Sequence, residues 1–386
     1  MRVRDLASVA VLVVVVSACG ADVGGSSTSA EPLPTSSTID GPTTTSTSVD
    51  TETPTSQPDT ASGDATVHPE VARDDLDGAS STFVDADGRM VSTVTPDGDY
   101  VLVDHATGLP VVSYNARSLD MWVDIGVSRA GTISHDDPFL RLQTAAQGIV
   151  AAARESGTAE SVTIEGREAA QATHREEYTF DEWTVVTDYT VAVDVETGLL
   201  VRYDVVQISP EPIPEEEPRK TVPGDVTTGT SVDEDMFKAY GSTDQTFDDG
   251  FVLAGTLEEA ATLAGYRLLV PSWLPEGFVL TQIAFGDEPA GLVDRQKMVV
   301  LTYRNWAWRI DVTMRSAGDF DEWDDPLDPE GRLQSIGTVR NFELRAGDVN
   351  APPHAWAVVD DQIVTVSGSI GPQTLKTIVE SLERIP

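Results

Sequence analysis

The stretch Asn305-Trp306-Ala307-Trp308-Arg309-Ile310-Asp311-Val312-Thr313-Met314-Arg315 alternates apolar and polar side chains over most of its length. The even-numbered positions from Trp306 to Met314 are large and apolar, whereas most odd-numbered positions are polar or charged. Successive side chains of a β-strand point to opposite faces, so one face of this strand is apolar and the other polar. The pattern predicts a half-buried strand of an antiparallel sheet.

Similar alternation recurs on both sides of this stretch, in short segments separated by Asp-Gly and Thr-Gly pairs. Such spacing is typical of a chain of antiparallel hairpins. In the first half we expect strands near 81–85, 89–95, 99–104, 109–114, 120–125, 160–165, 168–179, 183–194 and 199–208. In the second half we expect one strand that ends at Phe285 and others near 296–303, 306–314, 338–346, 354–359 and 362–367. The last two of these are joined by a turn at Asp360-Asp361.

A short pattern occurs twice, as Asp104-His105-Ala106-Thr107-Gly108-Leu109 and as Asp194-Val195-Glu196-Thr197-Gly198-Leu199. Each copy follows a Val-rich strand and precedes another. Gly108 and Gly198 suit the positive φ of a three-residue hairpin loop, which a β-branched residue resists. The repeat therefore predicts two hairpin turns, and this interpretation is favoured over a ligand-binding loop.

Three segments carry helix signals. Residues 136–138, Asp-Asp-Pro, supply caps and a first-turn proline for a helix over 139–155. Thr256-Leu257-Glu258-Glu259 is a capping box for a second helix. Few helices among many strands indicate an α+β fold class. A third helix begins at Pro372, and its apolar residues have the spacing of a helix lying on a sheet: Leu375, Ile378, Val379 and Leu382.

The N-terminus has the composition of an export signal. Arg2 and Arg4 precede an apolar run, from Leu6 to Val16, that is too short to span a bilayer. Val16-Ser17-Ala18-Cys19 resembles the lipobox of bacterial lipoproteins, in which the cysteine is acylated and becomes the mature N-terminus. Residues 1–18 are thus expected to be a lipoprotein signal peptide. Acylated Cys19 would anchor the protein in the cell membrane, on its extracytoplasmic face.

Composition also divides the rest of the chain. Residues 19–65 hold the acylated cysteine and a Ser/Thr/Pro-rich tether, which has too few apolar side chains to fold. Residues 209–250 are rich in Pro, Glu, Gly and Thr and are partly an interdomain linker. We expect one antiparallel sheet domain at 66–245 and a smaller α+β domain at 250–386.

The chain carries 25 basic and 64 acidic residues, a net charge of 25 − 64 = −39. Nucleic-acid binders need clustered Lys and Arg, so this composition excludes a nucleic-acid partner. Cys19 is the only cysteine, which leaves no second thiol for an intramolecular disulfide. The fold must therefore rest on burial of apolar side chains.

The sequence contains no recognisable catalytic motif. A nucleophile elbow, a phosphate-binding glycine loop and a dinucleotide fingerprint are all missing. We therefore predict that the protein is not an enzyme and has no catalytic residue, no cofactor and no metal site. The histidines are scattered, and none is paired at i+4 with another: His68, His105, His135, His174 and His354.

Two acidic segments and two tryptophans could either bind a ligand or have only a structural role. Asp85-Ala86-Asp87-Gly88 begins like a calcium loop but is better explained as a hairpin turn. The acidic segment 319–330 has enough oxygens for a hard cation, although a solvated loop is favoured. Trp122 and Trp183 lie on expected strands of the first domain, where core packing is favoured and ligand binding is the alternative.

Two resemblances follow from these motifs. The C-terminal part, from Thr256-Leu257-Glu258-Glu259-Ala260 through Leu274-Pro275-Glu276-Gly277-Phe278 to Val366-Ser367-Gly368, resembles the MucB/RseB C-terminal-type domain. The N-terminal part, with its hairpins, one helix and Thr-Gly-Leu turns, is similar to the LolA-like half-barrel of lipoprotein carriers and of RseB. The resemblance implies a curved antiparallel half-barrel around a helical plug and an apolar cavity, followed by a smaller antiparallel α+β domain.

The same resemblance implies a function. Such proteins carry or sense acyl chains, and RseB-type members bind an anti-sigma factor outside the cytoplasmic membrane. This chain would then be a non-catalytic, lipid-anchored binding protein of the cell envelope, a sensor or regulator whose partner is an envelope or anti-sigma-type membrane protein. The alternative is a lipid or lipoprotein carrier that holds acyl chains as its ligand. Its anchor and long tether depart from soluble carriers, which must diffuse.

Overall fold

The structure is a computed structural model, and its strands form antiparallel sheets with few helices, which confirms the α+β class. We call the part before residue 248 the N-terminal body and the part from residue 250 onward the C-terminal body. The residues that the structure describes are 80–85, 90–95, 99–104, 109–114, 121–124, 138–180, 183–208, 224–229, 244–247, 250–287, 296–317, 323–329, 331–349 and 351–385.

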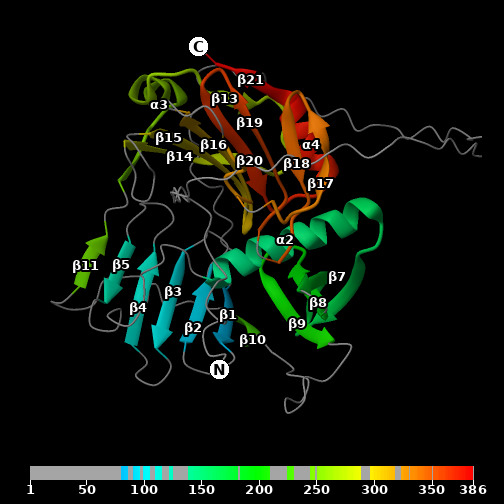
Figure 1. Cartoon of the computed structure of the whole chain (residues 1–386). Coiled ribbons are helices and arrows are strands. Elements are labelled where there is room, and N and C mark those ends of the chain that lie inside the picture. Colours follow the sequence, from blue (N-terminus) through cyan, green and yellow to red (C-terminus); the bar gives the residue numbers. More distant parts are fainter. Residues whose placement is uncertain are drawn as a thin grey trace, which may run out of the picture.

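The first sheet of the N-terminal body has seven strands in the order β10-β1-β2-β3-β4-β5-β11 (Figure 1). Strands β1 to β5 follow one another as a meander. Two later strands extend the sheet at its edges, β10 beside β1 and β11 beside β5. The strands are β1 Ser80–Asp85, β2 Met90–Val94, β3 Tyr100–Asp104, β4 Leu109–Tyr114, β5 Met121–Asp124, β10 Gly224–Gly229 and β11 Asp244–Phe247.

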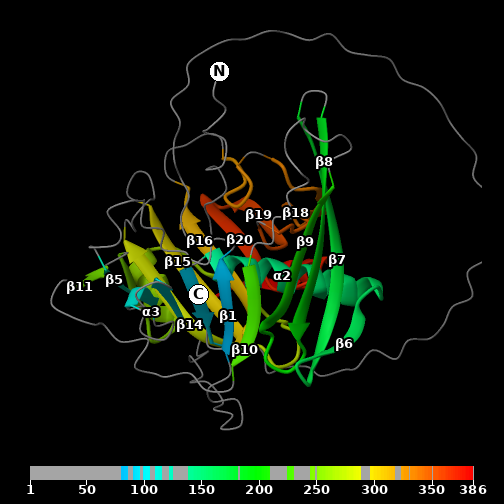
Figure 2. The same ribbon diagram turned by 90° about the horizontal axis from the view of Figure 1, so that it is seen from below.

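The second sheet of this body has four strands in sequence order, β6-β7-β8-β9. Its central hairpin, β7 and β8, extends beyond the neighbouring strands as a long arm (Figure 2). The strands are β6 Glu160–Ile164, β7 Arg167–Phe180, β8 Trp183–Asp194 and β9 Leu200–Ile208.

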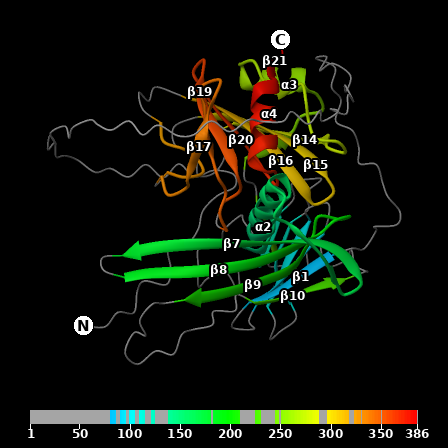
Figure 3. The same ribbon diagram turned by 90° about the vertical axis from the view of Figure 1, so that its right-hand side faces the viewer.

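Helix α2, Pro138–Ser156, lies between the sheets of the N-terminal body and the C-terminal body (Figure 3). Its buried residues Ala146 and Val150 pack in one cluster with Val191 of β8 and Leu200 of β9. The helix is followed by Gly157 at φ 71°, the conformation for which glycine suits a helix end. The expected helix is confirmed, and it is placed where both bodies meet.

The C-terminal body is built on an eight-stranded sheet in the order β12-β14-β15-β16-β20-β19-β18-β17. Helices α3, Leu257–Ala264, and α4, Pro372–Ser381, share one buried cluster with one face of this sheet, which we call the front face. The strands are β12 Phe251–Leu253, β14 Val279–Asp287, β15 Lys297–Asn305, β16 Trp308–Ser316, β17 Ser335–Val339, β18 Phe342–Arg345, β19 His354–Val359 and β20 Gln362–Gly368, with β13 Leu269–Pro271 and β21 Leu382–Arg384 as a separate pair.

The start of α3 confirms the capping box. The Thr256 hydroxyl accepts a hydrogen bond from the Glu259 amide at 3.1 Å. The Glu259 carboxylate accepts from the Gly255 amide at 2.7 Å, one residue before the cap. One amide of the first turn and one just before the helix are therefore satisfied by the side chains of Thr256 and Glu259.

Two strands arise where the sequence indicated a linker. β10 and β11 both lie within 209–250, and they pair along β1 and β5 respectively. Their composition, with many Gly, Thr and Asp residues, has little strand preference of its own. Pairing with an available edge strand outweighs that local preference.

The stretch 305–315 also differs in detail from its sequence pattern. Trp306 has φ 56° and belongs to the turn before β16, so it is not part of the apolar strand face. Ile310, Val312 and Met314 are completely buried on the front face, as expected. The other face is buried too, because Asp311 and Arg315 are only 4% and 6% exposed.

The expected strand over 338–346 is a tight hairpin of β17 and β18 instead. Arg340 and Asn341 turn the chain with φ of 48° and 73°. Asp360 and Asp361, with φ of 47° and 62°, make the turn that the sequence predicted between the last two strands. Asn and Asp tolerate positive φ, so such turns can be predicted from the sequence when the flanking segments have a strong strand pattern.

Candidate functional site

The Gln147 side chain on α2 is fully buried and joins three separate parts of the chain. Its Nε2 donates to the carbonyl oxygens of Gly198 at 2.6 Å and Ala307 at 3.0 Å. Its Oε1 accepts from the Ser369 hydroxyl. Gly198 belongs to the N-terminal body, whereas Ala307 and Ser369 belong to the C-terminal body. We call these four residues the joint, because the side-chain amide of Gln147 makes hydrogen bonds to both bodies.

The β8–β9 turn is shaped to reach this joint. The Asp194 carboxylate accepts hydrogen bonds from the amides of Glu196 at 3.0 Å and Thr197 at 2.7 Å, which fixes the turn. The Thr197 carbonyl then accepts from the Ala307 amide at 3.0 Å. Gly198 has φ 76°, which confirms the hairpin turn predicted for this copy of the repeat. Gly108, in the other copy, lies outside the described residues.

Glu155, near the end of α2, caps a helix of the other body. Its carboxylate accepts from the amides of Gln373 at 2.8 Å and Thr374 at 2.9 Å, and from the Thr374 hydroxyl at 2.5 Å. The N-cap residue Gly371 has no side chain to do this. A negative charge at a helix N-terminus is also favoured by the helix dipole.

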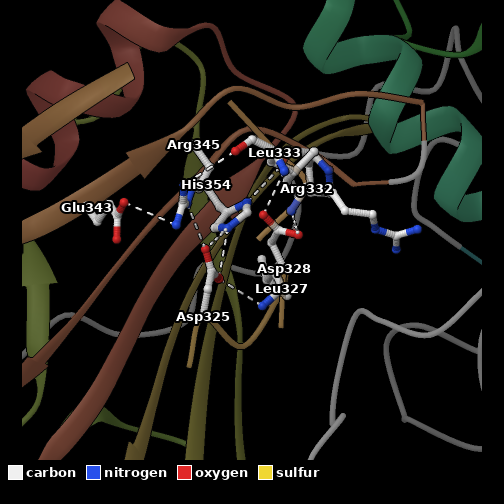
Figure 4. A network of polar contacts seen from close by, with 9 residues as sticks. Asp325, Leu327, Asp328, Arg332, Leu333, Glu343, Arg345 and His354 are labelled. Carbon is white, nitrogen blue, oxygen red and sulfur yellow. Dashed lines mark hydrogen bonds and ion pairs between the residues drawn. The ribbon is translucent and has the colours of Figure 1, made fainter. Parts of the chain in front are cut away.

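A second polar network ties a segment to the back face of the eight-stranded sheet, the face opposite α3 and α4. We call residues 323–329 and 331–333 the strap. His354 is completely buried, and its Nε2 lies 3.0 Å from both carboxylate oxygens of Asp325 on the strap (Figure 4). Arg345 lies 3.3 Å from the same carboxylate. A histidine and an arginine of the sheet therefore hold one carboxylate of the strap.

Asp328 fixes the conformation of the far end of the strap from within. Its two carboxylate oxygens accept from the amides of Arg332 at 2.8 Å and Leu333 at 2.7 Å (Figure 4). Asp325 and Asp328 are 4% and 5% exposed. The interpretation of 319–330 as a solvated acidic loop is therefore wrong for these two carboxylates, which make structural contacts.

Both ring nitrogens of His354 have polar partners. Nδ1 faces the Pro352 carbonyl at 3.1 Å, and Nε2 faces the Asp325 carboxylate. The ring is therefore held from both sides, by a backbone carbonyl at one nitrogen and by a side-chain carboxylate at the other. Burial alone would raise the pKa of Asp325, but the hydrogen bond and charge of His354 outweigh it, and the pKa lies below its ordinary value.

The site residues predicted from sequence lie apart from these networks. Trp122 is on β5, where it pairs with Ser113 and Thr246. Trp183 starts β8 at the tip of the long arm, opposite Phe180. The two tryptophans belong to different sheets, and ligand binding by either stays a prediction. Cys19 and the residues predicted to form a signal peptide and a tether lie outside the described residues.

None of the helices in the described segments has the length and apolar character needed to cross a bilayer. Within the same segments, no three His, Cys, Asp or Glu side chains are grouped as metal ligands would be.

Sequence reasoning missed the residues that make these networks. Gln147 looks like one of several polar residues on an amphipathic helix, and its partners are 51 to 222 positions away along the chain. Glu155 looks like an exposed acid at the end of the same helix. The one available signal was Gly371 directly before Pro372, because a helix start without a capping side chain needs an outside acceptor.

Comparison with known proteins gives distant likenesses alone. No family model and no curated protein matches the chain. Among solved structures, MucB in complex with MucA(peri) has a TM-score of 0.26 and 15% identity, covering 80% of this chain and 93% of that one. MucB alone has a TM-score of 0.24 and 16% identity over the same shares. At these values the fold assignment rests on the strand order described above.

Proposed function

We propose that this chain is a non-catalytic, lipid-anchored binding protein of the cell envelope, a sensor or regulator that acts through protein contacts as RseB-type proteins do. The lipobox-like residues 16–19 support the anchor, and the sequence resemblance to MucB/RseB domains supports the role. The observation that carries the proposal is the joint, because a sensor must pass a binding event from one part of the molecule to another.

The joint is suited to two discrete arrangements. A shift of α2 away from the C-terminal body would separate Gln147 from Ala307 and Ser369 and withdraw Glu155 from α4. Each buried polar group left without a partner costs about 1–3 kcal/mol, so intermediate positions are disfavoured. A ligand that binds one arrangement better than the other therefore shifts the whole molecule.

The partner is expected to be a membrane protein with an extracytoplasmic segment, within reach of the anchored molecule. Immobilised ectodomain, residues 20–386, is incubated with solubilised envelope proteins of its own host under mild crosslinking. The captured membrane protein is then identified, and its purified extracytoplasmic segment is titrated against the ectodomain. Saturable binding by wild type is expected, with the affinity changed by Gln147→Leu.

Gln334→Leu is the matched control, because Gln334 is exposed and lies outside the joint. It should bind the segment as wild type does. An ectodomain that retains no membrane protein, or a Gln147→Leu variant indistinguishable from this control, would remove the support for signalling through the joint. Co-bound acyl lipid in native mass spectrometry, without protein capture, would favour the carrier instead.

The anchor has its own test. The intact mass of the processed protein, isolated in detergent, should exceed that of the peptide from residue 19 by a diacylglyceryl group. Cys19→Ser should lose this mass and leave the membrane fraction. An uncleaved leader, or wild-type protein in the cytosol, would contradict the proposed location.

A further inference from the structure

Arg315 is a buried cation on the back face of the eight-stranded sheet. It is 6% exposed and pairs along the backbone with Met298 on one side and Ile363 on the other. Its neighbour Met314 points into the front-face core. Because side chains alternate along a strand, the guanidinium of Arg315 lies on the opposite side, the side that the strap crosses.

Arg315 differs from Arg167 and Arg309 in having no carboxylate partner among the described residues. Arg167 pairs with Asp194 at 3.3 Å, and Arg309 pairs with Asp311 at 2.7 Å. No carboxylate in the described part of the chain is within ion-pair distance of Arg315. Its contact is the ring of Trp323 on the strap, 5.2 Å from its Cζ. Burial lowers the pKa of Arg315 to about 10, which still leaves it charged at neutral pH.

That the described residues offer Arg315 no counter-ion is informative in this chain. There are 64 acidic residues against 25 basic ones, so a carboxylate for a buried arginine would be easy to provide. A buried charge with no partner is costly, and an aromatic ring over a guanidinium offsets a small part of that cost. The arrangement is therefore what a site for an external anion requires.

A second donor on the same face has no acceptor either. The indole Nε1 of Trp356 is buried, with no hydrogen-bond partner among the described residues. Trp356 pairs with Thr365, which pairs with Thr313, two residues from Arg315 on β16. Strand spacings of about 4.8 Å and rises of about 3.4 Å per residue put the Cα atoms of Trp356 and Arg315 roughly 12 Å apart. Two long side chains can converge across that distance.

We propose that Arg315, with the Trp356 indole as a second donor, binds a carboxylate or phosphate group of a small anionic ligand between the back face and the strap. Arg315 supplies the charge and a planar fork of N–H donors, which suits both groups. Trp323 rests on the guanidinium, and the strap is tied to the back face beside it through Asp325. The ligand therefore enters when Trp323 moves off the guanidinium, with the strap still attached at its other contacts.

The test is an anion titration of the ectodomain, residues 20–386, at constant ionic strength set with sodium chloride. Inorganic phosphate and acetate are the two probes, and tryptophan fluorescence and melting temperature are the readouts. Wild type should respond saturably to at least one probe, and the preferred probe distinguishes phosphate from carboxylate. Arg315→Met should weaken binding roughly tenfold or more, because hydrogen bonds to charged groups are the strong class.

Trp356→Phe keeps an aromatic ring and removes the N–H donor, so it should weaken binding by a smaller factor and leave the melting temperature without anion close to wild type. Arg175→Met is the control, because Arg175 forms an exposed ion pair with Asp188 on the N-terminal body. It should bind as wild type does. Arg315→Met should remain folded, since it replaces an unpaired buried charge by an apolar chain. A wild-type response that is absent, or that is unchanged in both Arg315→Met and Trp356→Phe, would overturn the proposal.

Discussion

Gly198 lies directly against the Trp308 indole, and a Cβ at position 198 would be 2.7 Å from Cδ1 and Nε1 of that ring. Trp308 cannot move aside freely, because it is 9% exposed and the Arg154 guanidinium lies over its ring, 5.6 Å from the centroid. The contact explains why glycine is needed at this turn for two reasons, a positive φ and close approach. It also shows how the β8–β9 turn fits against the C-terminal body.

Gly198→Ala should therefore lower the free energy of unfolding by about 2–4 kcal/mol, from backbone strain plus overpacking. Gly157→Ala is a matched control, because Gly157 has φ 71° but nothing within 4 Å of its Cβ position. The control should cost about 1 kcal/mol, the backbone contribution alone. Denaturant unfolding of both variants measures the difference. Equal losses would mean that the contact with Trp308 contributes nothing.

Glu155→Ala should destabilise the protein by about 1 kcal/mol, the usual value of a helix cap. The cap here is supplied by α2 to α4, so the same variant should increase amide exchange at Gln373 and Thr374. Glu380→Ala is the comparison, because Glu380 is exposed on α4, the helix that Glu155 caps, and its carboxylate makes no contact with Thr374. A loss of stability as large for Glu380→Ala would argue against a specific cap.

The sequence predicts local structure here better than it predicts the networks. The capping box at Thr256 and the turn at Asp360-Asp361 were predicted correctly because their causes lie within a few residues. β10 and β11 could not be, because their pairing partners lie far away in the chain. The side chains of Gln147 and His354 could not be predicted for the same reason, since their partners are distant in the sequence. In a sequence, a polar residue that will be buried looks like one that will be exposed until its hydrogen-bond partners are known.

Replacing tyrosine by phenylalanine should affect stability in opposite directions at Tyr303 and Tyr266. The Tyr303 hydroxyl is buried and has no hydrogen-bond partner among the described residues. The Tyr266 hydroxyl donates to the Met314 carbonyl at 2.8 Å. Tyr303→Phe should be neutral or stabilising by about 1 kcal/mol, and Tyr266→Phe should cost about 1 kcal/mol, because an unmade hydrogen bond in the core is unfavourable. Urea midpoints compare them directly, and a reversed order would show that Tyr303 has an acceptor.

Asp325→Asn tests the tie between the strap and the back face through its pH dependence. The pKa of Asp325 is lowered in the folded protein, so its contribution to stability is fully present above the ordinary value of an aspartate, about 3.9. That contribution is lost as the pH falls through the lowered folded value. At pH 7 the variant should lose about 3 kcal/mol, because it leaves His354 and Arg345 facing a neutral amide.

The difference in stability between wild type and Asp325→Asn should therefore shrink as the pH falls below about 4, where the carboxylate takes up a proton in the unfolded chain while it is still ionised in the folded protein. Asp324→Asn is the control, because Asp324 is adjacent on the strap and exposed. It should cost a few tenths of a kcal/mol at every pH. Urea unfolding at pH 7, 5, 4 and 3 measures both variants. A loss for Asp325→Asn that stays constant over this range would mean that the strap is held by shape and hydrogen bonding, and not by the charge of the carboxylate.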